Sequence, residues 1–411
     1  MKPLFSRHFL RFAPGLDILF RKLYCGEVRD TIPMKNSMDT IYDYIKWRGD
    51  ERFSYRPFSE TDAVILCYLA YLDINDAMRA SVRPSDPCTW RSDNRYKLRD
   101  ICHSTKEKGG GYNILTISGG FGESPLIDAM AVSKRFGDLW ISRLMEVYDE
   151  ENSVQFSAIT IALDNHSSFI AFRGTDDSLA GWKEDFMMSY TTVKAQELAL
   201  SYARQQIEDI LTNDERHVFY LGGHSKGGNL ALYSAATLPM DMWQSVQHVY
   251  MLDSPGLCLD AAPQVDLDHI AGRTTHIRPE FSVIGSLFDT SIPDTKIVKS
   301  NAKKMMQHDL SSWGVRYGDL YYTEKLAPAA KKIDEGLDRW LEKASAEERT
   351  AFVTELFDAI AAEGILHFKD TSAIDRHSIQ NIVLRVTNMS HDARATALSL
   401  PKELIKSMAK R

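Results

Sequence analysis

The chain has 411 residues, of which 44% are hydrophobic and 26% charged, and its formal net charge is −7 at pH 7. This composition is typical of a globular protein with one large domain or two, and the negative balance argues against nucleic acid as a partner. The five cysteines are scattered without metal-ligand spacing, which favours a reducing, cytoplasmic location and predicts no metal site. The sequence contains no apolar run of the length needed for a membrane-spanning helix.

Residues 1–56 are interpreted as a lead-in without a recognisable motif. Charged residues interrupt its apolar positions, so it does not resemble a secretory signal. Residues 1–24 mix aromatic and aliphatic side chains with arginines, a pattern that also occurs in segments lying on a membrane surface. Peripheral membrane contact through residues 1–24 is therefore one expectation. Pro14 interrupts the helical periodicity and favours the other, a segment docked on the body or a simple extension.

Three segments follow before the first expected strand. Residues 57–78 predict a buried helix, because Ser59 and Asp62 have the spacing of a capping box ahead of an apolar stretch. Residues 81–111 are polar and contain two prolines and three consecutive glycines, so 81–125 is interpreted as an insertion and a candidate lid. Residues 127–147 carry apolar side chains mostly at helical spacing, which predicts a further helix.

The next stretch alternates strands and helices. Residues 155–164 and 168–172 are apolar runs joined by turn residues, which predicts a hairpin. An amphipathic helix is expected over 192–212, followed by a buried strand, a turn and a helix over 218–238. This order predicts a parallel sheet with right-handed crossovers.

The turn within 218–238 has the sequence Gly223-His224-Ser225-Lys226-Gly227. A G-x-S-x-G motif between a strand and a helix is the nucleophile elbow of α/β hydrolases. Its small residues let strand and helix approach closely, and the helix N-terminus favours negative charge at the site. Ser225 is therefore the predicted nucleophile.

The histidine that activates Ser225 should lie late in the chain, because α/β hydrolases order their triad as serine, acid, histidine. His308 meets this requirement and is the predicted base. The turn should point the His224 ring away from Ser225. The other candidates lie at or before strand starts, on the opposite edge of a parallel sheet: His217, His248, His269 and His276.

The acid must be buried and must accept a hydrogen bond from the histidine ring. Strands are expected over 249–252, 275–278 and 297–298, and Asp253 ends the first of them, at the same edge of the sheet as Ser225. Asp253 is the favoured acid, and Glu280 and Asp289 remain alternatives.

An oxyanion hole is expected from the backbone N–H of Lys226, together with that of Thr175 or Asp176. A sharp glycine turn at Gly174, directly after a buried strand, should leave such N–H groups free. Arg173 is expected to anchor this loop. The side chain of Lys226 is expected either to face solvent or to meet an acidic ligand group.

Three motifs together carry a resemblance to a known family: F-R-G-T at 172–175, G-H-S-K-G-G-N at 223–229 and Q-H-D-x-x-S-W at 307–313. They resemble the class 3 lipase type of α/β hydrolase and, more closely, the bacterial Mbeg1-like group, over residues 40–320. The resemblance implies an α/β-hydrolase fold and an esterase- or lipase-like activity. The class 3 lipases place their acid where this chain has Ser282. The placement of Asp253 is similar to that in the pancreatic lipase family, whose acid lies one strand earlier.

The predicted fold is thus an α/β-hydrolase fold, with a mostly parallel central sheet flanked by helices over 57–324 and a helical C-terminal extension over 325–411. The predicted function is a serine hydrolase that cleaves carboxylic esters through an acyl-enzyme on Ser225, without a cofactor. The expected partner is a small-molecule ester or lipid, and acyl transfer to an alcohol remains open. The alternative is a catalytically defective hydrolase scaffold that binds or regulates a partner.

Overall fold

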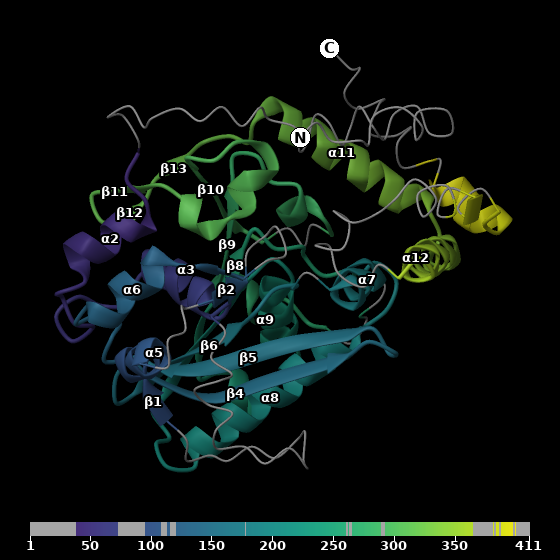
Figure 1. Cartoon of the computed structure of the whole chain (residues 1–411). Helices are drawn as coiled ribbons and strands as arrows, with labels where there is room; N and C mark the ends of the chain where they lie inside the picture. Colours follow the sequence, from purple (N-terminus) through teal and green to yellow (C-terminus); the bar gives the residue numbers. More distant parts are fainter. Residues whose placement is uncertain are drawn as a thin grey trace.

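A computed structural model describes residues 38–72, 95–107, 113–115 and 121–364, except 177, 260, 261, 263, 264 and 289–291, together with 381, 384, 385, 388–397 and 399. Within this part of the chain, a nine-stranded sheet has the strand order β1-β4-β5-β6-β7-β8-β9-β10-β13 (Figure 1). Its strands are β1 (Arg95–Lys97), β4 (Trp140–Asp149), β5 (Val154–Ala162), β6 (Ser167–Phe172), β7 (Val218–His224), β8 (Val246–Leu252), β9 (Thr274–Pro279), β10 (Asp294–Val298) and β13 (Tyr322–Thr323). Two small two-stranded sheets pair β2 (Asn113–Leu115) with β3 (Phe121–Glu123), and β11 (Val315–Arg316) with β12 (Asp319–Leu320).

Strands β6 to β10 run parallel to one another, and the strands at both margins of the sheet are antiparallel to their neighbours. Helix α8 (Lys194–Leu211) lies between β6 and β7 in the chain, and α9 (Lys226–Thr237) lies between β7 and β8. The expected hairpin is present as β5 and β6, with Ala158 opposite Phe172. This strand and helix arrangement confirms the predicted α/β-hydrolase fold.

Two apolar cores cover opposite faces of the sheet, because alternate residues of a strand point to opposite sides. On β6, Phe169 belongs to the core formed with α2 (Ile41–Arg48), α3 (Glu60–Leu69), α5 (Leu98–Glu107) and α6 (Pro125–Val132). Its neighbour Ile170 belongs to the core formed with α8 and α9. Helix α3 begins at the expected capping box, in which Ser59 and Asp62 bond each other's backbone N–H.

The single helix expected over 127–147 is wrong. Helix α6 ends at Val132, and β4 begins at Trp140 and pairs with β5 along its length. The pairing register shifts between Ser142 and Met145, and Arg143 has a φ of 58°. In the sequence, Leu144 and Met145 follow Ile141 at the three- and four-residue intervals of a helix, and the bulge accommodates this spacing within a strand. The interrupted strand thus imitated helical periodicity.

The C-terminal region contains α11 (Pro328–Lys343) and α12 (Ala346–Ala361), and Ser345 and Glu348 form the expected capping box. Helix α12 packs against α7 (Leu179–Met187), with the rings of Phe186 and Phe357 5.7 Å apart (Figure 1). Shorter helical turns are α10 (Met240–Trp243), η4 (Ala271–Arg273), η5 (Ile284–Ser286), η6 (Lys304–His308) and η7 (Leu310–Ser312).

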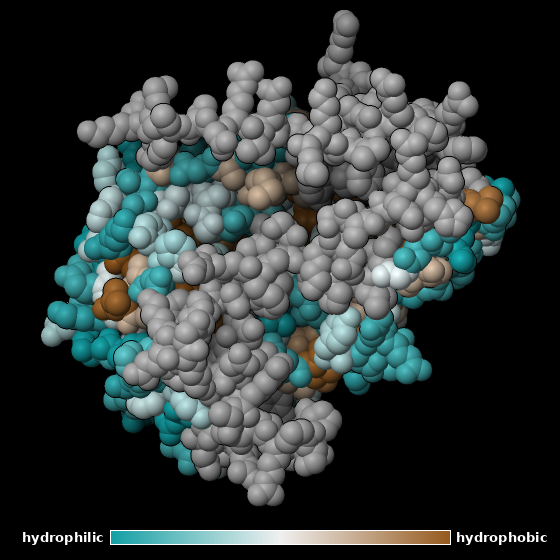
Figure 2. Space-filling view, in the orientation of Figure 1, coloured by the Kyte–Doolittle hydropathy of each residue, from teal (hydrophilic) through white to brown (hydrophobic). Residues whose placement is uncertain are grey.

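Several expectations on domains and membranes remain predictions. No helix in the described residues has the length and apolar character needed to cross a membrane. Residues 1–24 lie outside the described residues, and so does much of the candidate lid. The described part of the lead-in contributes α2 to the core, and β1 is an edge strand of the main sheet. The described surface visible in Figure 2 is largely hydrophilic, with small separate hydrophobic areas.

Candidate active site

Ser225 occupies the turn between β7 and α9, with φ 56° and ψ −132°. A residue with a side chain rarely adopts this conformation, so the surrounding contacts must hold it in place. One such contact is the hydrogen bond from the backbone N–H of Ser225 to the carbonyl of Leu252, at 3.0 Å. The elbow is thereby fixed to the end of β8, the strand that leads to Asp253.

The glycines of the elbow are required by close packing. A Cβ on Gly227 would lie 2.1 Å from the carbonyl oxygen of Phe172, and one on Gly228 would lie 2.5 Å from Cβ of Ser254. Asn229 is fully buried, and its amide nitrogen donates to the carbonyl of Gly256 at 2.5 Å. The motif therefore brings β6, the elbow and the loop after β8 into direct contact.

Asp253 and His308, the predicted acid and base, meet beside this loop. Nδ1 of His308 lies 2.7 Å from Oδ2 of Asp253, whose side chain is 1% exposed. The other carboxylate oxygen, Oδ1, accepts hydrogen bonds from Ser282 Oγ at 2.5 Å and from the Gly285 N–H at 3.2 Å. Burial opposes ionisation, but the contacts with His308 and Ser282 outweigh it and lower the pKa of Asp253 below its ordinary value. Asp253 is therefore ionised at neutral pH.

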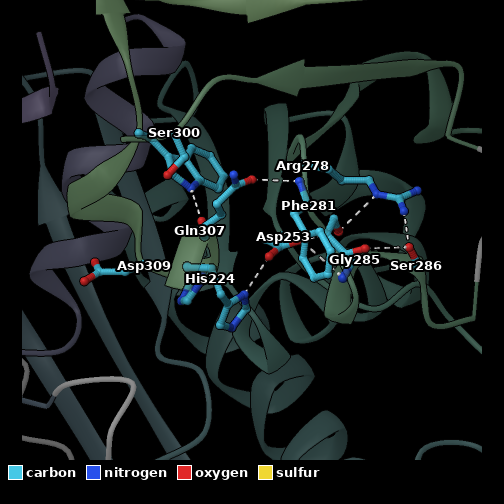
Figure 3. Close-up of polar contacts among 12 residues, drawn as sticks. His224, Asp253, Arg278, Phe281, Gly285, Ser286, Ser300, Gln307 and Asp309 are labelled. Atoms are coloured by element: carbon cyan, nitrogen blue, oxygen red, sulfur yellow. Dashed lines mark hydrogen bonds and ion pairs between the residues drawn. The ribbon is translucent and has the colours of Figure 1, made fainter. Parts of the chain in front are cut away.

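The segment around His308 is fixed by the other residues of the Q-H-D-x-x-S-W motif (Figure 3). The Gln307 side-chain oxygen accepts from the Phe281 N–H at 2.7 Å, and its backbone carbonyl accepts from the Trp313 indole at 2.9 Å. Asp309 caps the following turn by accepting from the Ser311 N–H. The contact with Phe281 holds the segment against the 280–287 loop, which also carries Ser282, and the other two contacts fix the segment internally.

His224, the residue before Ser225, takes part in the same arrangement. Its ring lies 4.2 Å from the His308 ring, and its Nε2 lies 2.8 Å from the carbonyl oxygen of His308. A carbonyl only accepts hydrogen bonds, so His224 Nε2 carries the proton and Nδ1 accepts from the Tyr71 hydroxyl at 2.8 Å. Burial, followed by the nearby His308, holds the pKa of His224 well below its ordinary value. His224 is thus neutral and ties the backbone of His308 to the elbow.

No motif in the sequence indicated this contact between His224 and Tyr71. Tyr71 follows α3 and lies 153 positions before His224 in the chain. Its hydroxyl also accepts from the Gly174 N–H at 3.2 Å. Tyr71 therefore connects the F-R-G-T loop to the histidines, a relation that depends on how α3 packs against the sheet.

Ser225 and His308 are not joined by a hydrogen bond among the residues that the structure describes. His308 uses Nδ1 for Asp253, which leaves Nε2 as the ring atom available to a serine. Hydrogen bonds of this kind are often long without a substrate and shorten in the complex. The described contacts therefore join acid and histidine directly, and His224 links the backbone of His308 to the elbow.

The F-R-G-T loop lies beside Ser225, because β6 and β7 are paired with Phe172 opposite Gly223. A Cβ on Gly174 would lie 3.1 Å from Cβ of Ser225. In the described part of the chain, no hydrogen bond occupies the backbone N–H of Thr175, Asp176 or Lys226. These are the donors that the sequence predicted for an oxyanion hole.

The expectation for the Lys226 side chain is wrong. It is 0% exposed, and Nζ donates to the Gln155 carbonyl at 2.8 Å and forms an ion pair with Glu184 of α7 at 3.0 Å. A second carboxylate, Asp185, lies 3.6 Å from Nζ, and Thr175 donates its hydroxyl to the other oxygen of Asp185. Burial opposes the charge of Lys226, but Glu184 and Asp185 outweigh it and raise the Lys226 pKa. Lys226 therefore connects the elbow to α7 and, through Asp185, to Thr175 of the F-R-G-T loop.

The structure describes one of the two alternative acids, Glu280. The backbone of Glu280 bonds Val298 and Ala327, and no contact joins its side chain to His308 in the described residues. Asp289 lies outside the described residues. Arg173 anchors its loop as expected, through an ion pair with Glu146 at 2.8 Å. Ser282 does not replace the acid but contacts it.

A family model described as Mbeg1-like matches residues 130–358, more than half of the chain. The chain belongs to the Mbeg1-like family. The matched region of this Mbeg1-like protein contains Ser225, Asp253 and His308 as well as α11, whereas Tyr71 lies before it.

Solved structures similar to this Mbeg1-like protein include three lipases. The lipase from Rhizopus microsporus var. chinensis is 11% identical, with 76% of this chain and 90% of that chain covered and a TM-score of 0.34. Lipase II from Rhizopus niveus is 11% identical, with 71% and 90% covered and a TM-score of 0.33. The Rhizomucor miehei lipase propeptide complex is 12% identical, with 73% and 83% covered and a TM-score of 0.32. No match is found among curated proteins.

Proposed function

We propose that this Mbeg1-like protein is a serine hydrolase that cleaves carboxylic esters, with Ser225 as nucleophile, His308 as general base and Asp253 as the acid behind it. The observation that carries the proposal is the 2.7 Å contact between His308 Nδ1 and the ionised, buried Asp253, next to an elbow serine with φ 56°. A carboxylate in this position fixes the tautomer of the histidine and stabilises the imidazolium that forms during the reaction.

In the proposed reaction, His308 Nε2 takes the proton of Ser225 Oγ as this oxygen attacks the ester carbonyl. The backbone N–H groups of Lys226 and of Thr175 or Asp176 stabilise the oxyanion that develops. The imidazolium then protonates the leaving alcohol, and the ester bond breaks to give an acyl-enzyme. His308 next removes a proton from water as the water oxygen attacks the acyl carbonyl. The bond between the acyl carbon and Ser225 Oγ then breaks, the imidazolium returns its proton to Oγ, and the acid product is released. With an alcohol in place of water, the same steps transfer the acyl group.

The proposed substrates are small-molecule or lipid esters, acylglycerols among them, and the proposed location remains cytoplasmic. The similarity to lipases supports a lipase-like hydrolase fold but leaves the acyl group open. A second candidate, a defective scaffold that binds a partner, is favoured by one observation. Ser225 and His308 share no hydrogen bond in the described residues.

A fluorophosphonate probe tests the proposal, because it reacts covalently with activated serines. We expect labelling of the wild type and none of Ser225→Ala. Ser201→Ala, on the exposed side of α8, serves as the matched control and should label like the wild type. Absence of labelling in the wild type, or equal labelling of Ser225→Ala, would favour the scaffold. Rates with p-nitrophenyl esters of increasing chain length would then separate an esterase from a lipase.

A further inference from the structure

Arg278 is a buried cation close to the proposed acid. It lies on β9 and is 6% exposed. Its Nε donates to Ser282 Oγ at 3.3 Å, and its Nη2 donates to Ser286 Oγ (Figure 3). Its ion-pair partner is Asp334 of α11, 3.6 Å away. The proposed reaction does not use Arg278, and a buried cation held by directed contacts requires an explanation.

The contacts have a fixed direction. A carboxylate only accepts hydrogen bonds, so the Ser282 hydroxyl donates its proton to Asp253. The Ser282 oxygen is then free to accept from Arg278 Nε. Arg278, Ser282, Asp253 and His308 therefore form one continuous chain of hydrogen bonds.

Helix α11 holds the loop that carries this chain. Ile333 and Leu337 pack against Phe281, Val283 and Leu287. The Ala327 N–H, just before the helix, donates to the Glu280 carbonyl at 2.6 Å. A side chain at Gly285 could not be accommodated, because its Cβ would lie 2.6 Å from Asp253 Oδ1. The helix therefore packs against the same loop that contacts Asp253.

We propose that Arg278, paired with Asp334 of helix α11, is a positioning residue that orients Asp253 and moderates its charge through Ser282. The inference rests on the proposed function and gives the C-terminal helix a part in the active site. A cation near the Asp253 carboxylate partly offsets its negative charge, so the carboxylate stabilises the His308 imidazolium less. Within the described part of the chain, the charged or titratable side chains in contact with His308 or Arg278 are Asp253, the neutral His224 and Asp334.

The test follows the His308 imidazole by NMR in the full-length protein, with the ¹⁵N-labelled ring titrated against pH. Arg278→Met removes the cation at similar length, and we expect the titration midpoint to rise by roughly half a pH unit or more. Ser282→Ala should move it in the same direction. Asp334→Asn removes the negative charge that partly offsets Arg278, so the His308 midpoint should fall. Arg278→Lys, which keeps the charge, should stay close to the wild type, as should Arg204→Met on the exposed side of α8.

The same variants are compared in fluorophosphonate labelling as a function of pH. The acidic limb of the labelling rate should shift with the NMR midpoint. Unchanged midpoints in Arg278→Met and Ser282→Ala, or equal shifts in Arg278→Met and Asp334→Asn, would overturn the inference. If Arg278→Met does not fold, Ser282→Ala and Asp334→Asn decide the question through their opposite signs. A wild type that does not label refutes the proposed function, whereas the NMR shifts still test Arg278.

Discussion

Two carboxylates beside the elbow have opposite environments. Asp253, on the histidine side, is contacted by His308, by the Ser282 hydroxyl and by the Gly285 N–H. Asp185, on the side of the F-R-G-T loop, accepts one hydrogen bond from Thr175, and its Oδ1 has no hydrogen-bond partner in the described residues.

The difference appears in the two pKa values. The contacts of Asp253 outweigh its burial and lower its pKa. Burial of Asp185 outweighs the attraction of Lys226 and raises its pKa to about 6, with Glu184 and Asp176 adding repulsion. Burial alone thus does not decide whether a carboxylate is ionised, because directed donors do so as well. The donors are concentrated on the side where the proposed mechanism needs a permanent negative charge.

The largest expected effect comes from neutralising Asp253, the carboxylate that accepts several hydrogen bonds. Asp253→Asn keeps the shape of the side chain but loses the charge that supports the imidazolium, and its amide favours the wrong tautomer of His308. We expect the rate constant of fluorophosphonate labelling to fall by about 10³–10⁴-fold. The measurement is a time course of labelling at neutral pH.

The matched variant for this prediction is Glu280→Gln, which neutralises the alternative acid. It should label within about twofold of the wild type, since its side chain does not contact His308. A large loss in Glu280→Gln together with a small one in Asp253→Asn would reverse the assignment of the acid.

The second prediction concerns Lys226, the buried cation beside Glu184 and Asp185. Lys226→Met leaves Glu184, which is 1% exposed, without its counter-ion. Removing one partner of a buried pair costs about 3–5 kcal/mol in the free energy of unfolding, and urea denaturation measures it. The double variant Lys226→Met/Glu184→Gln should recover part of this loss. Equal stability of the single variant and the wild type would show that Lys226 is not paired as described.

The histidine side was largely predictable from the sequence, and the reason is topological. The carboxyl ends of neighbouring parallel strands lie at one edge of a sheet, so Asp253 after β8 had to come close to Ser225 after β7. The chain order then left His308 as the suitable histidine. The hydrogen bond between Asp253 and Ser282 was not predictable, because it depends on the path of the loop after β9.

The contacts on the side of the F-R-G-T loop could not be predicted from the sequence. A lysine is usually exposed, and nothing in the sequence shows that Lys226 is buried. Its burial depends on α7, which brings Glu184 within 3.0 Å of its Nζ. Tyr71 reaches His224 only because α3 packs on the sheet. The bulge in β4, which accommodates apolar residues at the spacing of a helix, depends on pairing with β5. Each of these features arises from contacts between distant segments.

The third prediction addresses the raised pKa of Asp185, and its effect is the smallest. The folded protein keeps a proton on Asp185 up to about pH 6, whereas the ordinary value for the unfolded chain is 3.8. The folded state therefore binds more protons between these values, and the stability contributed by protonated Asp185 is lost as the pH rises from about 4 to 6. Asp253, whose pKa is lowered, contributes in the opposite sense and loses its contribution as the pH falls.

Urea denaturation at pH 4, 5, 6 and 7 measures this contribution. Relative to Asp185→Asn, which does not titrate, the wild type should lose on the order of 1–2 kcal/mol of unfolding free energy across this range. Asp241→Asn, on the exposed side of α10, is the matched control and should follow the wild type. If wild type and Asp185→Asn change in parallel with pH, Asp185 titrates like an ordinary surface carboxylate. The contrast between the two sides of the elbow would then rest on Asp253 alone.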